Sequence, residues 1–110
     1  MELKDLELPP VVTAAQGTNI STGVTCNGRY CQITTQTAGA AAGAEDSFVL
    51  TNSFIKPTSI VLVSFATASG GVPMVQATKL AAGSCTIVIT NLDGAAALDA
   101  ALVLNVLVLG

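Results

Sequence analysis

Two segments of the chain are apolar on both of the faces that a strand would present. In residues 60–66 and in residues 102–109, neither set of alternating side chains is clearly polar, and Asn105 is the lone polar residue of the second segment. Such a strand must be buried on both faces, unlike a strand that has one solvent-exposed face. The fold, or an assembly of chains, must therefore supply two covering surfaces.

The composition leaves little charge to coat an ordinary surface. Hydrophobic residues make up 51% of the 110 residues and charged residues only 10%, against about 25% in an ordinary soluble domain. The longest uncharged apolar run near the C terminus, residues 100–109, is too short for a helix that spans a bilayer with about 20 residues. We therefore expect no membrane insertion and infer that apolar surface is hidden in contacts between subunits.

The pattern along the chain predicts an all-β fold in a single domain, residues 13–110. Short β-favouring segments are separated by turn signals, which is typical of an antiparallel sandwich or barrel. Asn27-Gly28 predicts a hairpin between residues 24–26 and 29–31, and the glycines of residues 38–44 predict a loop. A faint echo, Thr51-Asn52 and Thr90-Asn91, indicates two strands that end alike, with Asn in a turn conformation. The expected strands are residues 32–37, 47–50, 60–66, 74–80, 86–90 and 102–109.

Residues 1–12 are expected to form an N-terminal arm. Three leucines precede two prolines that enforce an extended exit, and the first eight residues fit one helical turn, an extended arm or a disordered terminus. This stretch alternates acids with leucines and lacks the basic and apolar regions of a secretory signal, so we expect a protein made and kept in the cytoplasm or in something assembled there. If the arm docks on a partner, its candidate anchoring residues are Leu3, Leu6, Leu8, Pro9, Pro10 and Val11.

The residue types exclude most catalytic and metal chemistry. The chain has no histidine, which removes the commonest general base and metal ligand, and the acids in Gly-rich loops are expected to be solvated turn residues. Three cysteines cannot complete a four-cysteine zinc site. A bridge from Cys26 to Cys31 is geometrically possible, although a cytoplasmic origin favours free thiols. Four scattered basic residues give no footprint for nucleic acid. We expect no enzyme and no cofactor.

Residues 32–109 resemble a β-rich domain of tailed-bacteriophage virion proteins, found in capsid decoration (cement) and head-fibre proteins and near the ends of tail fibres. The resemblance rests on the order of several segments, and the region of residues 26–31 departs from it. The segments are Ile33-Thr34-Thr35, "SFVLTNSFI", "TSIVLVSF", "GVPMV", "AAGSCTIVITN" and "LVLNVLVL".

The resemblance implies a jelly-roll or tulip-like antiparallel β-sandwich that forms homotrimers and binds the major capsid protein on the outside of the shell. A trimer would cover the second face of both apolar strands, whereas a monomer would need a well-closed sandwich. The alternative function is a fibre-tip module that binds host-surface glycan through residues 38–46 and 68–73. The candidate trimer-interface residues are Val61, Val63, Phe65, Leu102, Leu104, Val106 and Val108.

Overall fold

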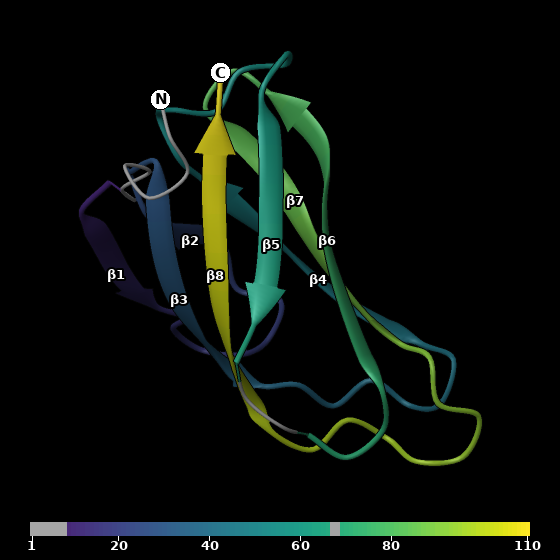
Figure 1. The fold of residues 1–110 in the computed structure, drawn as a ribbon. Helices are drawn as coiled ribbons and strands as arrows, with labels where there is room; N and C mark the ends of the chain where they lie inside the picture. Colours follow the sequence, from purple (N-terminus) through teal and green to yellow (C-terminus); the bar gives the residue numbers. More distant parts are fainter. Residues whose placement is uncertain (1–8, 67–68) are drawn as a thin grey trace, which may run out of the picture.

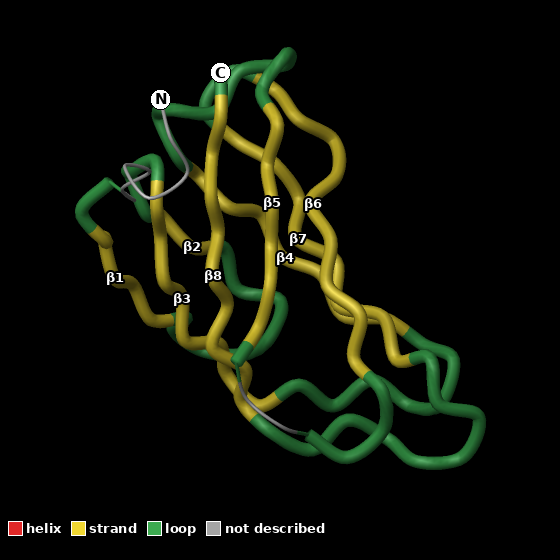
Figure 2. Tube along the Cα trace, in the orientation of Figure 1, coloured by secondary structure: helices red, strands yellow, loops and turns green. Residues whose placement is uncertain are grey.

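The computed structural model describes residues 9–66 and 69–110, and this part of the chain is all-β, with eight strands and no helix (Figures 1 and 2). The six strands expected between residues 32 and 109 are all present, and residues 38–44 form the expected loop. The strands are β1 (Val11–Ala15), β2 (Val24–Thr25), β3 (Tyr30–Thr37), β4 (Glu45–Thr51), β5 (Ile60–Phe65), β6 (Pro73–Ala81), β7 (Ser84–Asn91) and β8 (Ala101–Leu109).

The strands form two four-stranded sheets that pack face to face as a sandwich (Figure 1). The first sheet has the order β1-β3-β8-β5 and the second the order β2-β4-β7-β6. Both sheets are mixed, because β1 runs parallel to β3 and β2 runs parallel to β4. The prediction of an antiparallel sandwich, such as a jelly roll, is therefore wrong at these two edges. The reason is that the first four strands alternate between the sheets. When the chain comes back to a sheet two strands later, it runs in its original direction, so β3 is parallel to β1 and β4 is parallel to β2.

The hairpin predicted at Asn27-Gly28 does not form, since β2 and β3 lie in different sheets. The dipeptide instead carries the chain across the sandwich, where the Asn27 Oδ1 atom accepts a hydrogen bond from the Ser53 N–H at 2.9 Å. A larger residue in this crossing would displace the Val12 side chain, because a Cβ atom on Gly28 would lie 2.7 Å from Cγ2 of Val12. The turn signal was real, but tertiary contacts decide which strands it joins.

The core is built from the inward residues of both sheets. Along β8 every second side chain is buried, from Leu102 to Val108, and β7 alternates in the same way. Burial of such aliphatic side chains contributes about 1.5–3 kcal/mol each. The largest fully buried apolar side chains are Ile33, Leu50, Ile55, Ile87, Ile89, Leu102, Leu104, Val106 and Val108.

A β-bulge changes the alternation in β6. The register between β6 and β7 shifts between Thr78 and Ala81, and Lys79 has a positive φ of 52°. Strict alternation over residues 74–80 would place Leu80 with Met74 on one face and Lys79 on the other. Because a bulge inserts one extra residue, Leu80 packs against the core while Lys79 is exposed.

The asparagines of the two Thr-Asn pairs are buried, and each accepts two backbone hydrogen bonds at the end of a strand. Asn52 and Asn91 are both fully buried. The Oδ1 atom of Asn52 accepts hydrogen bonds from the N–H groups of Gly28 and Phe54. The Oδ1 atom of Asn91 accepts from those of Val72 and Asp93. Neither asparagine has a positive φ, so each shapes its bend through its side chain and not through the backbone conformation that we expected.

The sandwich has two distinct ends. The terminal end carries the start of β1, the end of β8 and the β6–β7 hairpin, and the loop end carries residues 38–44, 69–72 and 92–100 (Figure 1). Asn91 ties the loop end together, since its Nδ2 group donates to the carbonyl oxygens of Ala40 and Ala96 at 3.1 and 2.8 Å.

Candidate interaction face

The outward side chains of the first sheet form a continuous surface that we call the apolar face. Strand register fixes its members, because residues that pair across neighbouring strands point to the same side of the sheet. The face contains Val11, Thr13 and Ala15 of β1, Tyr30, Gln32 and Thr34 of β3, Val103, Asn105, Leu107 and Leu109 of β8, and Ile60, Leu62 and Ser64 of β5.

Large aliphatic side chains on this face are open to solvent in the single chain. Ile60 is 59% exposed and Leu62 is 52% exposed, with Val11 and Leu109 exposed by more than two fifths. Single exposed apolar residues are normal, but a contiguous patch of them marks an interaction site. The four residues belong to strands at both edges and the centre of the sheet, so the patch spans its width.

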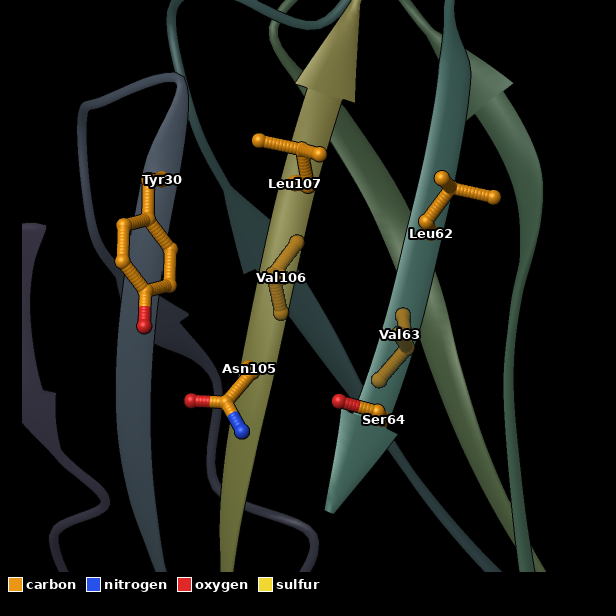
Figure 3. A pocket seen from close by; sticks show the side chains of 7 residues that line it. All are labelled: Tyr30, Leu62, Val63, Ser64, Asn105, Val106 and Leu107. Carbon is orange, nitrogen blue, oxygen red and sulfur yellow. The ribbon is translucent and has the colours of Figure 1, made fainter. Parts of the chain in front are cut away.

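The apolar face is hollowed between β3 and β5. A depression of about 360 Å³ lies over β8, with Tyr30 on one side and Leu62 on the other (Figure 3). Leu107 lies between them, and the polar side chains of Asn105 and Ser64 lie further along the same strands (Figure 3). The hollow is therefore apolar toward the terminal end and polar toward the middle of the sheet.

No charged residue belongs to any strand of the first sheet. Within residues 9–66 and 69–110 the charges lie instead toward the two ends of the sandwich. Strand direction places the cations, Arg29, Lys56 and Lys79, toward the terminal end and the acids, Glu45, Asp46, Asp93 and Asp99, at the loop end. The apolar face is thus a neutral surface between two charged ends.

The outward side chains of the second sheet, which we call the hydroxyl face, differ in chemistry. Most of them are Thr, Ser or Gln, and the exposed apolar members Val49 and Met74 are interspersed among them. Side-chain hydroxyls hydrogen-bond to water without a partner chain, so this surface needs no cover. Its polar residues include Ser47, Thr51, Gln76, Thr78, Thr86 and Thr90.

The structure places most of the interface residues predicted from the sequence in the protein core. The inward members of β8 are at most 1% exposed in the single chain, and the inward members of β5 face the same interior. Residues that are already buried within one chain cannot line an interface between chains that keep this fold. The buried residues are Leu102, Leu104, Val106 and Val108. Val61 and Val63 are half-buried and pack against the same core, whereas Phe65 is 37% exposed and its place in an interface stays a prediction.

The outward members of the same strands were missed because alternation cannot tell the inner face of a two-sided apolar strand from the outer one. Ser64 and Asn105 were the available signal. They pair across β5 and β8, and a polar residue marks the face that is not in the core.

The anchoring candidates fall on two sides of the described boundary. Leu3, Leu6 and Leu8 lie outside the described residues. Pro9 and Pro10 precede β1, and Val11 is the first residue of β1, where it pairs with Tyr30. Val11 and Val12, which were assigned to the arm, are therefore part of the sandwich.

The loops proposed for glycan binding do meet at the loop end, but acids at this end serve the fold. The Oδ1 atom of Asp99 accepts a hydrogen bond from the Gly70 N–H at 2.7 Å, and Asp46 accepts one from Gly39. The carboxylate of Asp93 accepts hydrogen bonds from the N–H groups of Ala96 and Ala95, which lower the pKa of Asp93. These acids are tied to loop backbone in the manner of turn residues.

The three cysteines are free and buried. Burial raises the pKa of Cys85 to about 11. The pKa of Cys31 is raised to about 12, mainly by burial and in smaller part by its hydrogen bond and charge interaction with Cys26. The Cys31 thiol donates a hydrogen bond to the Cys26 carbonyl oxygen at 3.2 Å. Thiols held neutral in this way are poor nucleophiles.

The described residues also contain no group of three or more His, Cys, Asp or Glu side chains that could hold a metal ion. Within the same residues there is no helix that is long and apolar enough to cross a membrane.

Comparison with known proteins gives no match, whether with family models, with curated proteins or with solved structures.

Proposed function

We propose that this protein is a structural subunit of a bacteriophage virion, a capsid decoration protein that forms homotrimers through its apolar face. The observation that carries the proposal is the uncharged, hollowed outer face of the first sheet, on which Ile60 and Leu62 are more than half exposed. Burying apolar area contributes roughly 25 cal/mol per Å². A protein with such a face gains stability by packing it against another protein surface.

The partner that suits this face best is a second copy of the same chain. A face without charge is complementary to another face without charge, because no ion is left desolvated when the two meet. The charged ends of each copy remain in water when the faces pack side by side. Three copies in a ring can each present this face toward a threefold axis, which closes the assembly.

The resemblance of residues 32–109 to virion decoration proteins supports a capsid as the second partner. The start of β1 and the end of β8 lie at the same end of the sandwich, since Val11 pairs with Tyr30 and Tyr30 pairs with Leu107 (Figure 1). We propose that this end faces the major capsid protein on the capsid exterior and that the anchoring residues reach it. The protein would be made in the cytoplasm of the bacterial host and would reinforce the shell without catalysis.

The test is cosedimentation of the purified protein with empty capsids assembled from the major capsid protein of the same genome. The full chain is expected to sediment with the capsids. A variant that lacks residues 1–10 is expected to remain folded and trimeric but to stay in the supernatant. Absence of binding by the full chain would contradict the decoration role, and retained binding by the shortened chain would contradict the anchoring role of the arm.

Glycan binding is the second candidate, and one observation favours it: residues 38–46 and 69–73 gather at one end of the sandwich. These loops contain no aromatic residue, although aromatic rings supply much of the contact in small-molecule sites. Saturable binding to a glycan array that is lost on mutation of residues in these loops, together with no binding to capsids, would favour this function over decoration.

A further inference from the structure

A row of polar side chains crosses the apolar face and is unlike its surroundings. Thr13, Gln32, Asn105 and Ser64 lie opposite one another on β1, β3, β8 and β5. The neighbouring row toward the terminal end consists of Val11, Tyr30, Leu107 and Leu62. A patch that served only for apolar burial would have no use for amides in its middle, because desolvating them costs free energy.

Two amides form the centre of this row. The Gln32 Nε2 group donates a hydrogen bond to the Asn105 Oδ1 atom at 3.3 Å, and β3 and β8 are the two inner strands of the sheet. Among the described residues no hydrogen bond uses the Asn105 Nδ2 group or the Gln32 Oε1 atom. This pair therefore offers donors and an acceptor to whatever covers the face.

A side-chain amide is a polar group that can satisfy a copy of itself. It carries both a donor and an acceptor, whereas an ammonium or a carboxylate would repel its symmetry mate. On a threefold axis each residue meets two copies of itself, and a ring of amides can close its own hydrogen bonds. An unpaired buried amide costs about 1–3 kcal/mol, so packings that separate the amides are disfavoured.

Resting on the proposed trimer, we propose that Asn105, oriented by Gln32, sets the number and register of the chains that pack on the apolar face. It does so by hydrogen-bonding to the same residue of neighbouring copies. The apolar residues around it supply the affinity, and the amide selects one arrangement among those that apolar contacts alone would allow. Single buried asparagines fix oligomer state in coiled coils by the same physics, at a cost in stability.

The first experiment compares the wild type with Asn105→Leu by light scattering coupled to size-exclusion chromatography. Asn105→Leu is expected to associate at least as tightly as the wild type but to give more than one stoichiometry, because no amide penalises the alternatives. The matched control is Gln76→Leu, which removes an amide from the hydroxyl face and is expected to leave a single trimer. Circular dichroism establishes that each variant is folded.

The second experiment tests proximity with Asn105→Cys under mild oxidation by dioxygen with a copper catalyst. Two of three thiols near an axis are expected to form a disulfide, so a covalent dimer appears on a nonreducing gel. Gln76→Cys and the wild type, whose own cysteines are buried, are expected to remain monomeric on the gel.

The outcomes separate the two proposals. A wild type that is monomeric overturns the proposed trimer and this inference with it. A trimeric wild type whose Asn105→Leu variant is also a single trimer, or whose Asn105→Cys variant forms no covalent dimer, overturns the role of Asn105 and leaves the trimer standing.

Discussion

The two sheets of this sandwich are alike on their inner faces and different on their outer faces. Both inner faces alternate fully buried aliphatic side chains, as β7 and β8 show. Outside, the first sheet presents Leu62 and Leu107 without a single charge, whereas the second presents Thr86 and Thr90. The inner faces are explained by the fold of one chain, and the outer face of the first sheet is the surface for which we propose a partner.

The largest expected effect is the loss of stability when a core side chain is shortened, and it tests whether the inner faces of the two sheets are equally part of the core. Leu104→Ala in β8 and Ile87→Ala in β7 each remove a fully buried side chain and should lower the free energy of unfolding by about 2–5 kcal/mol. Urea denaturation followed by circular dichroism measures this, at one fixed protein concentration because association stabilises the folded chain. A loss in one sheet of less than about 1 kcal/mol would show that its inner face is not a full part of the core.

The next effect tests the difference between the outer faces. Leu62→Asp places a charge in the apolar face and should weaken self-association by about a hundredfold or more, on the order of 2.8 kcal/mol. Val49→Asp, at an exposed apolar residue of the hydroxyl face, should leave the mass in solution unchanged. Sedimentation velocity over a range of concentrations measures both. Equal effects of the two substitutions would remove the distinction between the faces.

A smaller effect concerns the strand ends of the second sheet. Asn91→Ala leaves the N–H groups of Val72 and Asp93 without their acceptor, which should cost about 1–3 kcal/mol. Hydrogen exchange should rise at residues 38–44 and 92–100, at the loop end. Asn52→Ala should do the same at the terminal end instead. Exchange that rises equally at both ends in each variant would contradict the local role of these side chains.

The smallest expected effect is the pH dependence of stability that arises from two buried thiols, one on the inner face of each sheet. The pKa of Cys31 and of Cys85 lies above the ordinary value of 9.0 because burial favours the neutral thiol. Above about pH 9 the unfolded chain therefore loses these protons before the folded chain does, and stability falls as the pH rises. The unfolding temperature should decline from about pH 8 to about pH 10.5, less steeply in Cys85→Ala. An equal slope in this variant would contradict the assignment to Cys85.

The sequence predicted the strands well because their period is local information. Residues 102–109 alternate two apolar sets, so β8 was expected within one residue of its start. The same alternation could not tell Leu104 from Leu107, since both sets are aliphatic. Which set faces the core is decided by the partner sheet, and the choice of interface residues went wrong there.

Local sequence patterns also could not predict which of the two sheets each strand joins. Asn27-Gly28 is a turn signal, but the chain crosses the sandwich at this point. There Gly28 lies close to Val12 and donates a backbone hydrogen bond to the side chain of Asn52. The parallel pairing of β1 with β3 follows from this crossing and has no signature in either strand. Of the polar row, the sequence showed Ser64 and Asn105 as polar residues within apolar strands, whereas Gln32 joins the row only through pairing between distant segments.

The mass of the purified 110-residue chain in solution tests the central claim most directly. Light scattering coupled to size-exclusion chromatography, at micromolar concentration, should give three times the 11.0 kDa of one chain. A mass equal to one chain at every concentration would contradict the claim that the apolar face is covered by further copies. If the variant lacking residues 1–10 then associated, the N-terminal segment of the same chain would be the occupant of the apolar face.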